Sequence, residues 1–314
     1  MIEVRNLTKT FGSITAIDNI SFHIHSNEVV GFLGKDGAGK STTLNILTGY
    51  LDWDAGSILI HGYDLSRSPK KAKKTIGYLP ENPPLYPEMT VWEYLDFVHR
   101  LKNITGRNIR SQIKNILEMT QLSEEKDRLI ASLTKGTQQK VGFAGALCGD
   151  PDILLLDEPT AWLDPAQIYE MRNLIKELGK NHTILFSSHL LHEISAICDK
   201  VIIISKGKIV AEDTLASLSS YANHSRQLVI KCKGSEKDVM RMLYSIPEAL
   251  LANFLGMKEP GTVSFMVESR PEDDIRQAIF ESCAQRQIPL LEMEPLTISL
   301  EDVFLKLTSG QGGN

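Results

Sequence analysis

The sequence has few cysteines and no long apolar run. Its cysteines, Cys148, Cys198, Cys232 and Cys283, show no CxxC spacing, which argues against a disulfide scaffold or a zinc site and favours a reducing compartment. A membrane-spanning helix needs about 20 apolar residues in succession. Apolar runs such as Ile153–Leu156 have only four residues. We therefore expect no transmembrane helix, so any role at a membrane would require a partner.

The sequence also has no excess of basic residues. The 34 lysines and arginines face 39 aspartates and glutamates, which gives a net charge of -5 and a sequence pI near 5.9. Proteins that bind nucleic acid usually present a basic surface, so no nucleic-acid partner is expected. Met1–Gly12 is polar and charged where a secretory signal has its apolar segment, which favours a cytoplasmic location. A chain of 314 residues with a globular composition fits two domains.

The first part of the sequence alternates short apolar strands with helices, the pattern of an α/β domain over residues 1–218. The strands expected there are Ile2–Leu7, Ile20–Ile24, Val29–Leu33, Ser57–Ile60, Thr75–Leu79, Ile153–Asp157, Thr183–Ser187, Val201–Ser205 and Lys208–Glu212. The helices expected there are Lys40–Thr48, Val91–Leu101, Asn108–Thr120, Thr137–Cys148, Ala166–Gly179 and Leu190–Cys198. Strand patterns are missing between Asn82 and Leu133, which predicts an inserted helical subdomain of about residues 82–135.

A second pattern begins after a polar stretch at residues 219–226, which we interpret as a linker. Its predicted elements are a strand at Gln227–Cys232, a helix at Glu236–Tyr244, strands at Leu250–Leu255 and Thr262–Val267, a helix at Glu272–Arg286 and a strand at Leu290–Met293. This βαββαβ order predicts a small ferredoxin-like α+β domain over residues 227–308. Residues 309–314 are expected to be a disordered tail.

One glycine-rich segment matches a phosphate-binding motif. Gly34–Ser41 follows the pattern GxxxxGK[ST], with a predicted strand before it and a predicted helix after it. Glycines allow backbone N–H groups to surround phosphate oxygens, Lys40 supplies positive charge, and the hydroxyl of Ser41 suits Mg²⁺. The alternative is a glycine-rich turn that merely opens a helix, and the strand at Val29–Leu33 argues against it.

Two carboxylates follow an apolar strand. Asp157 and Glu158 end Ile153–Glu158, a position that corresponds to the ligand-binding edge of a parallel sheet. Because side chains alternate along a strand, the two are expected to have different tasks. Asp157 suits the Mg²⁺ shell and Glu158 suits a general base that polarises water. The alternative is that both merely end a strand before Pro159.

These motifs together resemble the ATPase subunit of ABC transporters, from Ile2 to about Leu218. Leu133–Lys140 resembles that family's signature, in the variant found where the partner is an ABC-2 type permease. The resemblance implies a P-loop NTPase fold. It also implies that the signature residues bind the γ-phosphate held by the other subunit, so that one chain carries two half-sites. The signature residues are Thr134, Lys135, Gly136 and Thr137.

Further residues match the family in order along the chain. Phe11, with Ala16 nearby, stands where an aromatic residue stacks on adenine, and Asp164 ends a segment resembling the D-loop. His189 resembles the switch histidine that contacts the γ-phosphate, although a single histidine after a strand is more often an ordinary surface residue. The resemblance implies this set of ATP-binding residues: Phe11, Ala16, Gly34, Lys35, Asp36, Gly37, Ala38, Gly39, Lys40, Ser41 and Thr42.

Some positions depart from the family pattern. Glu81 replaces a common glutamine that reaches Mg²⁺, so the implied metal set is Ser41, Asp157 and Glu81. A carboxylate there can still bind Mg²⁺ but adds negative charge near the phosphates. Trp162 replaces a small D-loop residue.

The resemblance implies an ATP-hydrolysing subunit that uses ATP and Mg²⁺. It would form a homodimer, or pair with another ATPase subunit, and would power a separate permease from the inner face of the cell membrane. Leu296–Leu305 resembles the ending of exporter subunits, which favours export. A soluble ABC ATPase acting on DNA, ribosomes or cofactor assembly, and a P-loop GTPase or kinase, are the alternatives. For the C-terminal domain, regulation, dimer stabilisation and ligand sensing stay open.

Overall fold

The chain forms two compact units. The computed structural model describes residues 1–102, 109–215, 217, 226–257, 259–270 and 272–295. The first unit spans Met1–Leu215, and the second lies within Ala216–Lys306. Apart from Arg226, the predicted linker falls outside the described residues, as do the predicted tail and Leu296–Leu305.

A six-stranded, mainly parallel sheet forms the centre of the first unit, with the strand order β10-β9-β3-β8-β7-β6. Its strands are β3 (Val29–Leu33), β6 (Ile76–Leu79), β7 (Ile153–Asp157), β8 (Thr183–Ser188), β9 (Lys200–Ser205) and β10 (Lys208–Thr214). All neighbours run parallel except β9 and β10. Every residue of β7 is buried, as expected for a parallel strand covered on both faces. The carboxyl ends of β3, β6, β7 and β8 therefore meet at one edge.

An antiparallel sheet forms the second layer of this unit, with the order β2-β1-β4-β5. Its strands are β1 (Ile2–Phe11), β2 (Ile14–Ile24), β4 (Ala55–Ile60) and β5 (Tyr63–Asp64). The hairpin β1-β2 is longer than the sequence predicted, because backbone pairing continues to Phe11 and Ile14, which are both exposed. Strand prediction from buried apolar residues therefore missed this part of the hairpin. It also missed the two-residue β5.

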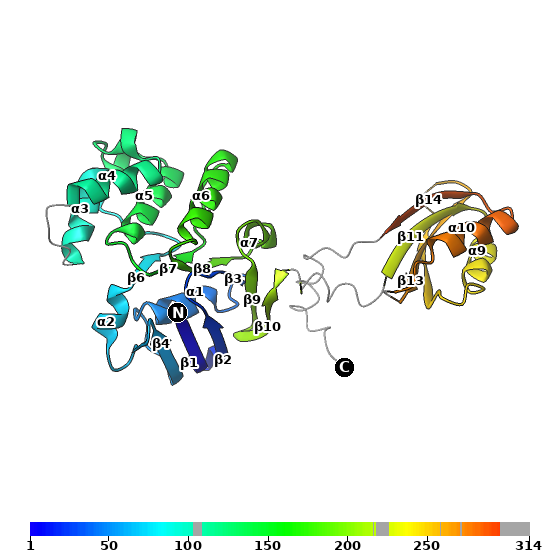
Figure 1. The fold of residues 1–314 in the computed structure, drawn as a ribbon, viewed down its shortest axis with the longest axis horizontal. Helices are drawn as coiled ribbons and strands as arrows, with labels where there is room; N and C mark the ends of the chain where they lie inside the picture. Colours follow the sequence, from blue (N-terminus) through cyan, green and yellow to red (C-terminus); the bar gives the residue numbers. More distant parts are fainter. Residues whose placement is uncertain (103–108, 216, 218–225, 258, 271, 296–314) are drawn as a thin grey trace. The chain divides into compact units, whose positions relative to one another are not determined.

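Helices complete the first unit. Those beside the sheets are α1 (Lys40–Leu47), α2 (Pro69–Lys74), α6 (Pro165–Leu178) and α7 (Leu191–Ile197). The predicted helical insertion contains α3 (Val91–Leu101), α4 (Ile109–Met119) and the 3-10 turns η1 (Ser123–Glu125) and η2 (Ile130–Ser132), and α5 (Lys135–Leu147) follows them. Figure 1 shows α3, α4 and α5 lying together in cyan and green. Tyr94 and Leu95 are buried there, which supports a packing role for the aromatic stretch of α3.

Two helix starts differ from prediction by more than one residue, and a local hydrogen bond explains the first. Helix α5 begins at Lys135 rather than Thr137, because the Thr134 side chain accepts a hydrogen bond from the Thr137 backbone N–H and caps the helix. Helix α10 (Arg276–Gln285) begins four residues later than the predicted Glu272. The N-cap residue of α10 is Ile275, whose side chain makes no capping hydrogen bond.

The second unit has the element order βαββαβ: β11 (Arg226–Lys233), α9 (Glu236–Leu243), β12 (Leu251–Gly256), β13 (Thr262–Ser269), α10 and β14 (Leu290–Pro295). Its strands form one antiparallel sheet in the order β12-β13-β11-β14, the split βαβ arrangement of ferredoxin-like folds. Buried residues of both helices join the sheet in one core, among them Ile230, Val239, Phe265 and Ile279. Across the described residues of the whole chain, no helix has the length and apolar character needed to cross a bilayer.

Candidate functional site

A cavity of about 490 Å³ lies where the phosphate-binding motif, the acidic strand end and the predicted switch histidine come together. Its volume is within the range of small-molecule sites. The residues that line it are Ala16, Asp36, Gly37, Gly39, Lys40, Ser41, Thr42, Glu81, Glu158, Thr160, Ala161, Ile168, His189, Leu190 and Glu193. Residues far apart in the sequence thus share one site because parallel strands end at the same edge of the sheet.

The glycine-rich loop connects β3 to α1, and its backbone explains its composition. Gly37 and Gly39 have φ angles of +75° and +110°, which residues other than glycine rarely adopt. A Cβ atom on Gly39 would lie 2.8 Å from the carbonyl oxygen of Ala16, and one on Gly34 would lie 2.6 Å from that of Ile204. The loop can therefore approach its neighbours closely and can present backbone N–H groups to an anion.

Lys40 brings a buried positive charge to this loop. Its side chain is only 6% exposed, and Nζ donates hydrogen bonds to the carbonyl oxygens of Gly34 at 2.6 Å and Lys35 at 3.3 Å. Glu158 Oε1 lies 3.6 Å from the same nitrogen. A buried ammonium group beside a glycine-rich turn is suited to hold phosphate oxygens.

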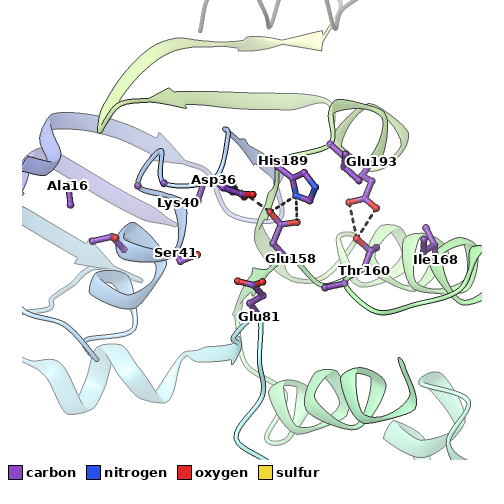
Figure 2. A pocket seen from close by; sticks show the side chains of 15 residues that line it. Ala16, Asp36, Lys40, Ser41, Glu81, Glu158, Thr160, Ile168, His189 and Glu193 are labelled. Carbon is purple, nitrogen blue, oxygen red and sulfur yellow. Dashed lines mark hydrogen bonds and ion pairs between the residues drawn. The ribbon is translucent and has the colours of Figure 1, made fainter. Parts of the chain in front are cut away.

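Glu158 and His189 form a pair on the cavity wall. Nδ1 of His189 lies 3.1 Å from each carboxylate oxygen of Glu158, and Figure 2 shows the two side chains pointing toward each other. Burial raises the pKa of Glu158, and this effect outweighs the opposing influence of His189 and Lys40. A carboxylate with a raised pKa is a better proton acceptor, which is the property that a general base requires.

The side chains of Asp157 and Glu158 point in different directions, but the predicted alternation along a strand is not the reason. Strand β7 ends at Asp157, and Glu158 has a left-handed φ of +47°. Asp157 is 2% exposed and accepts a hydrogen bond of 2.5 Å from Ser187 Oγ. The same Ser187 oxygen accepts one of 3.1 Å from the backbone N–H of Glu158. The end of β8 thereby holds both acidic residues.

Except for Phe11, the remaining residues predicted to bind nucleotide or metal lie on the cavity wall or in its glycine-rich loop. Those on its wall are Ala16, Asp36, Gly37, Gly39, Ser41, Thr42 and Glu81. Gly34, Lys35 and Ala38 belong to the same loop without lining the cavity, and Ala38 is buried. Phe11 lies at the end of β1, is 48% exposed and has Lys9 Nζ 5.3 Å from its ring centre.

The predicted signature residues lie elsewhere. Residues Thr134–Thr137 form the cap and first turn of α5, and none of them lines the 490 Å³ cavity. They adjoin the predicted D-loop, because a Cβ atom on Gly136 would lie 2.9 Å from the carbonyl oxygen of Trp162. Asp164 caps α6 and accepts a hydrogen bond from the Gln167 backbone N–H. Trp162 is 66% exposed, with a left-handed φ of +67°.

Sequence reasoning missed several residues of the site. Thr160, Ala161, Ile168, Leu190 and Glu193 line the cavity, and none was predicted to do so. One signal could have identified Glu193. It lies on the buried side of α7 with Ile194 and Ile197, where a carboxylate is out of place unless it has partners in the fold.

The sequence is similar to ATP-binding proteins of ABC transporters. The family described as "ABC transporter" matches residues 17–161. The uncharacterized ABC transporter ATP-binding protein YxlF of Bacillus subtilis (strain 168) is 32% identical over 98% of this chain and 99% of its own length. The bacitracin transport ATP-binding protein BcrA of Bacillus licheniformis is 30% identical over 99% of this chain and 98% of its own.

A solved structure shows the same likeness in three dimensions. It is the dimeric post-hydrolysis state of the ATP-binding cassette MJ0796 bound to ADP and Pi, and it is 26% identical to this chain with a TM-score of 0.63. The match covers 68% of this chain and 99% of that one.

Proposed function

This chain belongs to the family of ABC transporter ATP-binding proteins, and we propose that two copies of it bind two ATP molecules head to tail and drive a separate permease in the direction of export. Its family makes it an ATP-hydrolysing subunit whose partners are a second ATPase subunit and a membrane permease. Export is supported by a relative whose name states that direction, the Nod factor export ATP-binding protein I of Paraburkholderia xenovorans (strain LB400), which is 30% identical over 98% of this chain and 96% of its own length. The likeness of Leu296–Leu305 to exporter subunits agrees with it, although that segment lies outside the described residues.

The division of the site between two surfaces carries this proposal. Lys40, Glu158 and His189 meet in one cavity, whereas Thr134–Thr137 lie at the start of α5 and do not line it. A site with its phosphate loop and base on one surface and its signature on another is completed when a second copy supplies the missing half. The γ-phosphate then favours the closed dimer because both halves contact it only in that state.

We assign the chemical roles from the contacts in the cavity. Lys40 and the backbone N–H groups of its loop hold the phosphates, and the family resemblance assigns the adenine to Phe11 and Ala16. Glu158 accepts the proton of the attacking water, because its oxygens lie on the cavity wall and burial raises its pKa. His189 orients Glu158 through the 3.1 Å contacts and reaches toward the γ-phosphate.

The donor set fits Mg²⁺. Ser41, Asp157 and Glu81 offer only oxygen ligands, and no described group of three or more histidine, cysteine, aspartate or glutamate residues forms a metal cage. Mg²⁺ is usually held by one or two carboxylates together with phosphates and water, so a complete protein cage is not required. When bound, Mg²⁺ neutralises phosphate charge. Ser41, Asp157 and Glu81 are the residues that would hold it.

The permease partner requires a docking surface outside the nucleotide cavity. A groove of about 830 Å³ lies between the end of α1, strand β6 and helices α3 and α5, and Tyr50, Tyr78, Tyr94 and Val98 are among its lining residues. Tyr50 is 84% exposed there. We assign the permease to this aromatic groove, because exposed aromatic side chains are enriched where proteins bind partners. The ATPase would then sit on the cytoplasmic face of the cell membrane.

The test is dimerisation of the purified full chain. Glu158→Gln should bind Mg·ATP but hydrolyse it about 10²- to 10⁴-fold more slowly, because it lacks the base. The variant should therefore accumulate as a dimer with ATP, as measured by size-exclusion chromatography with light scattering. The control is Thr134→Arg on the same background, which blocks the signature and should abolish the dimer.

Four results would contradict the proposal. Wild-type protein without ATPase activity would remove the enzymatic function. Normal hydrolysis by Glu158→Gln would exclude Glu158 as the base. An ATP-bound Glu158→Gln protein that stays monomeric, or a dimer that persists with Thr134→Arg, would exclude a site shared between two copies.

A further inference from the structure

Glu193 is a buried carboxylate that the roles assigned above leave without a task. It lies on α7 and is 2% exposed. Among the described residues of the first unit, the other buried lysine, histidine and acidic side chains are Lys40, His99 and Asp157, and Lys40 and Asp157 belong to the proposed phosphate and metal sites. Placing a carboxylate in the interior is costly unless hydrogen bonds compensate for the lost water. Its contacts therefore indicate what it holds.

Three side chains surround the Glu193 carboxylate. Thr160 Oγ1 lies 2.8 Å from both of its oxygens, and Ser188 Oγ donates to Oε2 at 2.8 Å. The Ser188 oxygen also accepts a hydrogen bond from the Leu190 backbone N–H, so its own hydrogen is directed to Glu193. Arg172 Nη2 lies 3.9 Å from Oε1. Figure 2 shows the Thr160–Glu193 pair beside the Glu158–His189 pair.

These partners come from the segments that carry the proposed chemistry. Thr160 lies two residues after Glu158, Ser188 directly precedes His189, and Arg172 is on α6, whose first turn is capped by Asp164. One carboxylate thus connects the exit of β7, the exit of β8 and the helix after the D-loop. Thr160 and Arg172 lie far from Glu193 in the sequence, so these two contacts exist only in the folded chain.

The turn that Glu193 holds is a demanding one. Glu158 has a φ of +47° and Trp162 a φ of +67°, and Thr160 lies midway between them. Left-handed backbone is unfavourable for a residue with a side chain. Such conformations persist where surrounding contacts hold them. The hydrogen bond from Thr160 to Glu193 is a buried contact at the centre of this turn.

We propose that Glu193 is a positioning residue for ATP hydrolysis. By holding Thr160 and Ser188 together, it keeps Glu158 within 3.1 Å of His189 and directs the Glu158 carboxylate at the attacking water. Glu193 is not a second base, because both of its oxygens are occupied by hydroxyl groups and its side chain is buried. This inference depends on the proposed ATPase function and on Glu158 as its base.

Steady-state hydrolysis and nucleotide binding of full-length variants test the role. Glu193→Ala should lower kcat about 10²-fold, the usual cost of a misplacement near 1 Å in a catalytic group, while KM and the Kd for Mg·ATP change less than about threefold. Glu193→Gln keeps the shape of the side chain and one acceptor oxygen, so it should recover about tenfold of the lost rate. The control is Glu177→Ala, which removes the exposed ion pair between Glu177 on α6 and Lys180, and it should keep the wild-type rate.

A second measurement separates positioning from general damage to the fold. If Glu193 acts through Glu158, then Glu193→Ala should have little further effect in a protein that already carries Glu158→Gln. Should Glu193→Ala fail to fold, Thr160→Val removes the partner hydroxyl with little change of shape and should lower kcat in the same way. Nucleotide binding by each variant confirms that the cavity is intact.

The outcomes are distinct. A wild-type kcat in folded Glu193→Ala overturns the inference and leaves the ATPase function in place. A rise in KM as large as the fall in kcat also overturns it. So does an effect of Glu193→Ala on kcat that is as large in the Glu158→Gln background as in the wild type. Either result would show a structural role only. Absence of ATPase activity in the wild-type protein would instead refute the proposed function.

Discussion

Ser187 joins the two acidic residues of the site, so its removal should be costly. Its hydroxyl donates to Asp157 and accepts from the Glu158 backbone N–H. Ser187→Ala removes a hydrogen bond to a buried carboxylate, worth about 1.5–3 kcal/mol, and leaves the Glu158 N–H without its acceptor, which costs about 1–3 kcal/mol. Because both losses come from one hydroxyl, we expect a decrease of about 3 kcal/mol in the free energy of unfolding of the first unit.

Tryptophan fluorescence during urea unfolding can measure this change in the full chain. All three tryptophans, Trp53, Trp92 and Trp162, lie in the first unit, so their emission reports on that unit alone. Ser195→Ala is a suitable control. Ser195 Oγ donates to the His192 carbonyl oxygen in an exposed contact of 3.3 Å, and its loss should change stability by less than about 0.5 kcal/mol.

A double-mutant cycle sharpens the test. Asp157→Asn and Ser187→Ala share a hydrogen bond, so their effects should fail to add by about 1 kcal/mol or more. If Ser187→Ala destabilises the first unit no more than Ser195→Ala, or if its effect adds fully to that of Asp157→Asn, then the hydroxyl does not hold the acidic strand end.

Two further predictions concern the same turn. Because burial raises the pKa of Glu158, the base becomes protonated and kcat falls at a pH above the ordinary glutamate range. His189→Ala removes a contact that lowers this pKa, so it should move the fall in kcat to higher pH in a pH–rate profile. An unmoved profile in folded His189→Ala would contradict this. Because Trp162 has a φ of +67°, Trp162→Gly should be about 1 kcal/mol more stable than Trp162→Ala in urea unfolding. This is the reverse of the usual order of glycine and alanine. A more stable alanine variant would show that the turn is not strained.

Local motifs were predicted well because each depends on neighbouring residues. The strand, glycine loop and helix at Val29–Leu47 follow directly from periodicity and composition. The order of elements in the second unit also follows from the pattern along the sequence. Errors concentrated at element ends, as at Thr134, where one side-chain hydrogen bond decides the first residue of a helix.

The family and its phosphate-binding chemistry were accessible from sequence alone, because the residues that carry them occur in contiguous motifs. The tertiary structure decided which other side chains complete the site. Ser187 and Glu193 have no motif that predicts their partners, since Ser187 meets Asp157 and Glu193 meets Thr160 only where parallel strands β7 and β8 end together. Likewise, the direction of Glu158 follows from a left-handed turn held by distant contacts, which strand periodicity does not contain.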